Sequence, residues 1–213
     1  MSTRRTTSML LALAALLSAC SSANASNIRY TDPEQQSLLE LPSDWHLYEQ
    51  DELAGVADLP FMGSVGNIDF PTRSVVAFDG APSAAAANLT TDLASSPFPI
   101  GATSVRTIDT STRDLISRLI LARSVIDFTT YGEVADVSKE DFSFGKGFEG
   151  VRRLLALTTT DGQAQAVVYL ISVTNPADDR LYSVAVGCSR DCFVENQEEI
   201  ERVVDSWLVN TKG

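Results

Sequence analysis

Apolar residues in the last third of the chain predict a three-stranded antiparallel meander. Strands are expected over 151–159, 164–173 and 180–187, where β-branched residues and leucines are dense. An Asp-Gly pair at 161–162 separates the first two strands and is a strong hairpin signal. A turn with proline at 175–179 precedes the third strand. The meander is the clearest structural signal in the sequence.

Helical spacing predicts two helices beside these strands. The first should begin near Asp191, a good N-cap residue, and present one apolar stripe to the sheet. The stripe consists of Ile200, Val203, Val204 and Trp207. A second helix is expected over 111–124, with leucines and isoleucines on its buried face. The dipeptide at 208–209 is expected to be a short extended tail.

Shorter strands and an ambiguous region complete the pattern. Strands are expected over 45–48, 73–79 and 103–109. The stretch 81–99 has an alanine run bracketed by prolines, so it fits either a helix or a loop with one short element. The elements together predict an α+β fold, an antiparallel sheet with helices packed on its faces.

The first 20 residues have the layout of a bacterial lipoprotein signal. Arg4 and Arg5 precede an apolar run at 9–17 that is too short to span a bilayer. The run ends in Leu-Ser-Ala-Cys at 17–20, which resembles the lipobox. This resemblance implies cleavage after residue 19 and acylation of Cys20. A plain signal peptide with an incidental cysteine is the alternative.

The signal determines the expected domain organisation and cellular location of the protein. Residues 1–19 are expected to be the signal peptide, 20–40 the lipidated cysteine and a flexible tether, and 41–213 a single domain. A tether of twenty residues would reach roughly 25 Å. Two acyl chains are enough for stable anchoring. The expected location is the extracytoplasmic face of a cell membrane.

Charge narrows the range of partners. The chain has 28 acidic and 16 basic residues, a net charge of −12. Loss of Arg4 and Arg5 with the signal would leave 14 basic residues and a net charge of −14. Such a surface repels phosphate backbones, so nucleic acid is not expected as a partner.

Two cysteines remain if Cys20 is acylated, and they lie four residues apart at Cys188 and Cys192. An exported protein meets oxidising conditions, so a structural disulfide between them is favoured. A redox pair is the alternative, but the spacing is not that of a Cys-x-x-Cys motif. A zinc site lacks ligands because His46 is the only histidine, and no metal is expected.

Other motifs give no catalytic group. Residues 145–150 match Gly-x-Gly-x-x-Gly, but a strand follows rather than a helix, so a glycine-rich turn is the better interpretation. No Gly-x-Ser-x-Gly elbow accompanies His46. Asp178 and Asp179 lack the spacing of a calcium loop. Neither an enzyme activity nor a cofactor is expected.

Several of these patterns together resemble a known fold family. They are a strand opening with Gly-Val-Arg-Arg at 150–153, the hairpin and the two strands after it, and a final helix ending in Ser206-Trp207. A Pro-x-x-Trp pattern at 42–45 precedes them. Over 42–209 the chain resembles the PsbP-like α/β/α sandwich, in particular the LpqN-like lipoproteins of actinobacteria. Members of this fold are mostly binding or assembly proteins, so the resemblance implies binding rather than catalysis.

These inferences lead to one expected function and two alternatives. The first is a non-enzymatic, membrane-anchored lipoprotein that binds a protein partner in the cell envelope. The second is a carrier or sensor of an apolar small molecule, held in a pocket between sheet and helix. Its lining would be aromatic: Phe142, Phe144, Phe148, Tyr169 and Tyr182. The third is a hydrolase that uses scattered carboxylates.

Overall fold

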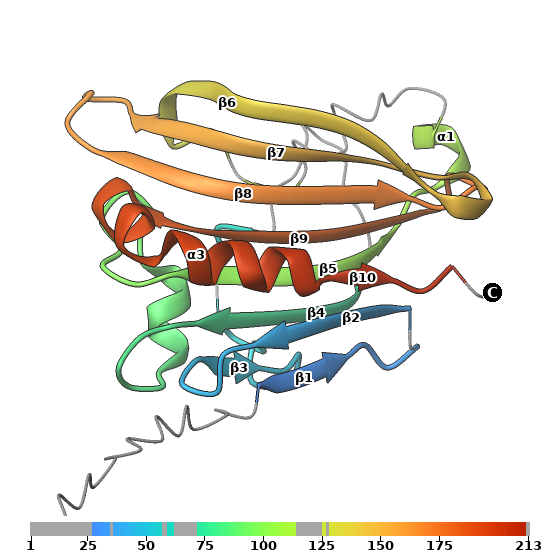
Figure 1. Ribbon diagram of the computed structural model, residues 1–213, viewed down its shortest axis with the longest axis horizontal. Coiled ribbons are helices and arrows are strands. Elements are labelled where there is room, and N and C mark those ends of the chain that lie inside the picture. The colour runs from blue at the N-terminus through green and yellow to red at the C-terminus, as the bar shows by residue number, and fades with distance from the viewer. Residues whose placement is uncertain are drawn as a thin grey trace, which may run out of the picture.

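The computed structural model describes residues 27–34, 36–56, 59–61, 72–113, 125–126 and 128–211. This part of the chain forms a seven-stranded sheet, a three-stranded sheet and one long helix (Figure 1). All paired strands run antiparallel.

The large sheet has the strand order β3-β4-β5-β9-β8-β7-β6. Its strands are β3 (His46–Tyr48), β4 (Thr72–Asp79), β5 (Ile100–Thr107), β6 (Tyr131–Phe144), β7 (Phe148–Thr159), β8 (Gln165–Thr174) and β9 (Arg180–Ser189). The small sheet has the order β1-β2-β10, with β1 (Ile28–Thr31), β2 (Ser37–Leu41) and β10 (Leu208–Val209). The helical segments are η1 (Ala86–Thr90), α1 (Thr110–Arg113), η2 (Gly145–Gly147) and α3 (Arg190–Ser206).

The predicted meander is confirmed as β7, β8 and β9. Gly162 in the first turn has a positive φ of 71°, which glycine adopts without a steric penalty. The expected strands at 45–48, 73–79 and 103–109 correspond to β3, β4 and β5. The stretch 81–99 contains one short element, η1, within an otherwise irregular segment. The long strand β6 was not predicted.

Helix α3 and the small sheet cover one face of the large sheet. Apolar side chains of α3, such as Ile200 and Val203, form one cluster with Leu39 of β2 and Val184 of β9. The other face packs against non-strand segments, which contribute Leu53, Phe61, Leu89 and Leu93. Among the described residues, a long α-helix covers one face, and the short 3₁₀ helix η1 lies on the other. Of the second predicted helix, α1 forms the start, and 114–124 lie outside the described residues.

Both ends of α3 form hydrogen bonds with residues of neighbouring strands. Its N-cap is Ser189, whose Oγ accepts a hydrogen bond from the backbone N–H of Cys192 at 3.4 Å. The predicted N-cap at Asp191 was therefore wrong by two residues. Helix α3 begins at Arg190, and Asp191 lies in its first turn, where its negative charge interacts favourably with the helix dipole. At the other end Trp207 Nε1 donates to Thr103 Oγ1 at 3.1 Å, which fixes the helix against β5.

The disulfide joins the end of β9 to the first turn of α3. Cys188 and Cys192 are bonded, and both are buried in the cluster under the helix. The structure thus contains the pair that the spacing predicted, in a position where it supports the strand-to-helix junction.

The predicted tether is wrong for residues 28–40. Strands β1 and β2 occupy much of this segment, so the folded domain already includes residues from Ile28 on. Leu39 and Leu41 alternate with less buried positions and are completely buried. Their burial against α3 provides the free energy that orders the segment. Residues 1–26, which include Cys20, lie outside the described residues.

No helix in the described part of the chain is both long and apolar enough to cross a membrane.

Candidate functional site

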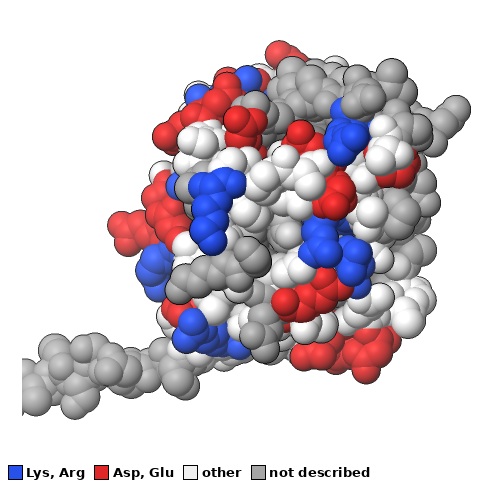
Figure 2. All heavy atoms as spheres, turned by 90° about the vertical axis from the view of Figure 1, so that its right-hand side faces the viewer, with Lys and Arg blue, Asp and Glu red and all other residues white. Residues whose placement is uncertain are grey.

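A groove lies at one end of the large sheet, where four segments meet. They are the β1–β2 turn, the β6–β7 turn, the β8–β9 turn and the residues after β10. Figure 2 shows this end of the molecule, where basic and acidic side chains lie close together. The groove has a volume of about 410 Å³. It is lined by Glu34, Gln36, Lys146, Phe148, Asn175, Pro176, Arg180, Tyr182, Asn210 and Thr211.

Two aromatic rings form the inner part of the groove. The ring centroids of Phe148 and Tyr182 lie 6.2 Å apart, and Tyr182 is only 4% exposed. The hydroxyl of Tyr182 donates to Gln36 Oε1 at 3.0 Å. Burial raises the pKa of Tyr182 above its usual value of 10, so the hydroxyl stays neutral and remains a donor at physiological pH.

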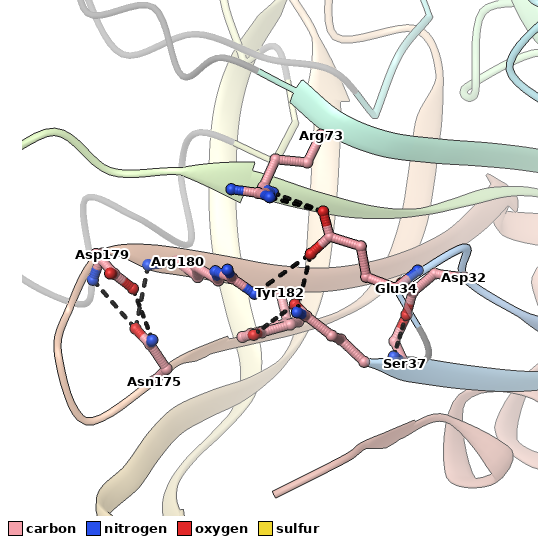
Figure 3. A network of polar contacts seen from close by, with 9 residues as sticks. Asp32, Glu34, Ser37, Arg73, Asn175, Asp179, Arg180 and Tyr182 are labelled. Carbon is pink, nitrogen blue, oxygen red and sulfur yellow. Dashed lines mark hydrogen bonds and ion pairs between the residues drawn. The ribbon is translucent and has the colours of Figure 1, made fainter. Parts of the chain in front are cut away.

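An ion-pair network forms the wall beside the β1–β2 turn (Figure 3). Glu34 Oε1 accepts hydrogen bonds from Arg73 Nη2 at 2.7 Å and Arg73 Nε at 3.1 Å. Glu34 Oε2 accepts from Arg180 Nη1 at 3.4 Å. The hydrogen bond from Arg73 is the main reason that the pKa of Glu34 is lowered. Glu34 is therefore a fixed negative charge that holds two arginines in place.

The turns that carry these side chains are themselves hydrogen-bonded. The buried carboxylate of Asp32 accepts the backbone N–H of Glu34 at 2.9 Å and that of Ser37. In the β8–β9 turn, Asn175 Oδ1 accepts the backbone N–H groups of Asp179 and Arg180, both at 3.1 Å. The groove is thus pre-organised on both sides.

The β6–β7 turn contributes a lysine with an unusual backbone conformation. Lys146 has a φ of 66° and lies between Gly145 and Gly147. Its Nζ donates to the carbonyl oxygen of Thr211 at 2.9 Å, which links the turn to the residues after β10. The Gly-x-Gly-x-x-Gly match is therefore a glycine-rich turn between strands, as predicted.

Other residues noted in the sequence lie away from the groove. His46 is on β3, and its Nε2 lies 3.1 Å from the carbonyl oxygen of Ala81. Among the described residues, no group of three or more His, Cys, Asp or Glu side chains is placed to hold a metal ion. Arg153, only 4% exposed, pairs with Asp136 of β6 at 2.7 Å.

Four of the aromatic residues proposed for a carrier pocket belong to or pack against one cluster between the large sheet and α3: Phe142, Phe148, Tyr169 and Tyr182. Tyr169 contacts Phe193 of α3, with centroids 5.9 Å apart, and lies under the Arg152 guanidinium at 5.3 Å. Phe148 and Tyr182 also line the end groove. Phe142 packs at the edge of the cluster under the helix. The side chain of Phe144 lies outside the described residues.

The open edge of the large sheet is a second exposed surface. It is formed by β6, whose Val137 is 61% exposed. Two register shifts interrupt its pairing with β7, and Glu133, Lys139 and Glu140 are exposed along it. Bulges and edge charges are the usual devices that prevent strand addition. We therefore place the candidate site at the groove.

Comparison with known proteins identifies a similar fold but no related sequence. No protein-family model matches the chain, and no curated protein sequence matches it. Among solved structures, the chain is similar to cyanobacterial PsbP (CyanoP) from Synechocystis sp. PCC 6803. The TM-score is 0.52 at 15% identity, over 91% of this chain and 99% of CyanoP. The chain has a PsbP-like fold.

A second solved structure is the Ran-binding protein Mog1p of Saccharomyces cerevisiae. It matches with a TM-score of 0.48 and 7% identity, over 87% of this chain and 96% of Mog1p. Because the identity to CyanoP is only 15%, the similarity concerns the PsbP-like fold alone. The roles of residues in this PsbP-like domain have to be argued from its own geometry.

Proposed function

We propose that this chain is a membrane-anchored extracytoplasmic lipoprotein whose PsbP-like domain binds a protein partner in the cell envelope without catalysing a reaction. The lipobox-like sequence that ends at Cys20 supports the anchor. The open groove, with its fixed ion pairs and aromatic inner surface, supports docking.

Because β1 begins at Ile28, the proposed tether is shorter than the sequence predicted. Residues 21–27 are all that separates Cys20 from β1. Fully extended they span about 25 Å, and as a flexible coil about 15 Å. β1 begins at Ile28, and its other end leads to the turn that carries Glu34 of the groove. The domain would stay close to the membrane with its groove open to a partner.

The observation that carries the docking function is the state of the groove side chains. Glu34, Arg180, Asn175 and Tyr182 are already bonded to neighbouring protein groups. A general acid or base needs a pKa near the working pH, whereas the pKa of Glu34 is lowered and that of Tyr182 raised. Such groups present a fixed pattern of charge and hydrogen bonds, which suits recognition of a surface.

The carrier alternative has less support. A carrier site encloses most of its ligand in a mainly apolar cavity. Between the large sheet and α3, Tyr169 contacts Phe193 and the disulfide packs into the same cluster. Phe148, at 9% exposure, is also buried. Side chains of the protein thus fill the space that a ligand would need there.

In-cell photo-crosslinking tests the proposed function. Benzoylphenylalanine placed at position 210, on the exposed groove lining, should give a discrete protein adduct in intact cells. The matched control is the same group at position 163, an exposed site in the β7–β8 turn at the opposite end of the sheet. We expect no such adduct from the control.

Two results would count against the proposal. The first is an absence of protein adducts at position 210, and the second is the same set of adducts from both positions. The experiment should be repeated with Cys20→Ala, which is expected to abolish the adduct by removing the protein from the membrane where its partner resides.

A further inference from the structure

Lys146 occupies a backbone conformation that favours glycine. Its φ of 66° and ψ of 24° lie in the left-handed region. A side chain there is crowded by the following carbonyl oxygen, and lysine has no side-chain group that offsets this locally. Strained residues of this kind cluster at ligand-binding sites. With Gly145 and Gly147 on either side, a third glycine would adopt this turn at lower energy. Folding stability alone therefore does not explain a lysine at this position.

The Lys146 side chain is placed at the groove. Its ammonium is held by the carbonyl oxygen of Thr211 at 2.9 Å, on the groove lining. Arg180 is the second cation of the lining, and 28% of its side chain is exposed. The long 3.4 Å contact from Arg180 to Glu34 is weak beside the 2.7 Å contact from Arg73. Glu34 is thus neutralised mainly by Arg73.

The lining has the opposite sign to the rest of the protein. Lys146 and Arg180 give two positive charges against one negative charge from Glu34, whereas the whole chain has a net charge of −12. Asp32 and Asp179 lie beside the lining and act electrostatically on Tyr182, so the two cations offer a local contact for a carboxylate rather than a broad positive potential. Phe148 and Pro176 add apolar surface beside the two cations.

We propose that the groove binds a carboxylate of an acidic peptide segment on the partner protein, between Lys146 and Arg180, with an adjacent apolar side chain against Phe148 and Pro176. Ammonium and guanidinium groups form short, charge-assisted hydrogen bonds to carboxylates. This inference rests on the proposed docking function and adds the chemistry of the partner.

Fluorescence anisotropy with the full chain, purified in mild detergent, tests the inference. The probe is a fluorescein-labelled heptapeptide with one Glu between Leu and Phe and an amidated C-terminus. A companion has Gln in place of Glu. A third peptide has no acidic side chain but a free C-terminal carboxylate. We expect the Glu peptide to bind at least tenfold more tightly than the Gln peptide, with an affinity that falls as salt is added. The third peptide tells whether a chain terminus can supply the carboxylate.

Substitutions assign the binding to the groove. Lys146→Gln and Arg180→Gln should each weaken binding of the Glu peptide about tenfold. Lys139→Gln is the matched control, since it removes the same charge from an exposed position on β6 and should leave binding unchanged. Lys146→Gly should weaken binding and also raise the melting temperature by about 2–4 °C, because the turn is relieved of its side chain. A variant that is more stable but binds less cannot owe its loss to misfolding.

Three results would overturn the carboxylate site: equal binding of the Glu and Gln peptides, unchanged binding by Lys146→Gly, or no binding of any peptide. If these occur while position 210 still crosslinks to a protein, the docking function stands and only its chemistry is wrong. If the peptides bind as expected but no protein is crosslinked, the site stands and the docking function fails.

Discussion

Reduction of the Cys188–Cys192 disulfide should destabilise the domain by about 2 kcal/mol. The bond closes a loop with a sequence separation of only four residues. For a loop this short, the restriction of the unfolded chain is worth about 2 kcal/mol at 25 °C. For a domain of this size, a loss of that magnitude lowers the melting temperature by about 4–8 °C. The effect should appear at the junction of β9 and α3, which the bond joins.

Thermal unfolding followed by circular dichroism checks this estimate. The oxidised protein, the protein with reductant and the double variant Cys188→Ala, Cys192→Ala are compared. The intact mass should rise by two hydrogens on reduction. Ser189→Ala, which removes the N-cap of the same helix but keeps the disulfide, is the matched control and should cost about 1 kcal/mol. Equal melting temperatures for the oxidised and reduced protein would refute the reasoning.

Three other perturbations test the anchor, the helix attachment and the groove wall. Cys20→Ala should move the protein from the membrane to the soluble or secreted fraction, and retention in the membrane would contradict the anchor. Trp207→Phe should cost about 1–2 kcal/mol in urea unfolding, because the buried hydrogen bond to Thr103 is lost. The hydrogen bond from Arg73 lowers the pKa of Glu34 below 4.5. The ion pair between Glu34 and Arg73 therefore stabilises the fold fully above pH 4.5, and this stabilisation is lost as the pH falls through the lowered pKa of Glu34. Glu34→Gln should make the acid-induced loss of stability shallower, and an unchanged pH profile would argue against the ion pair.

The parts of the fold that were predicted correctly are indicated by residues close together in the sequence. The meander is marked by dense apolar strands and by the Asp161-Gly162 turn, which are read within a few residues. The spacing of Cys188 and Cys192 is similarly local. Helix α3 shows its apolar stripe directly in the sequence, although its N-cap was misplaced because Ser189 and Asp191 are both good N-cap residues.

The strands that were missed depend on distant partners. β6 is exposed along most of its length, so its sequence lacks the apolar alternation of a half-buried strand. It is held by backbone pairing with β7. β2 was assigned to the tether because the polar residues before it resemble a linker. Its order comes from β10 and α3, which lie more than 150 residues further along the chain.

The groove could not be predicted because it is assembled from four distant segments. The glycine-rich motif at 145–150 correctly indicated a turn, but the strain at Lys146 is visible only in the backbone angles. Glu34 lies within the segment that was predicted to be a tether, so no pattern in the sequence indicated its contact with Arg73. Phe148 and Tyr182 were expected between sheet and helix and do belong to that cluster, but the sequence did not indicate that they also line a groove at the end of the sheet.

Native mass spectrometry of the full-length protein, extracted from its own cells in mild detergent, tests the central claim most directly. The account predicts a chain that lacks residues 1–19, carries acyl groups on Cys20 and retains a protein-sized adduct that Lys146→Gly weakens. An unprocessed chain, or a processed chain that carries only a small apolar molecule, would contradict a lipoprotein that docks a protein partner.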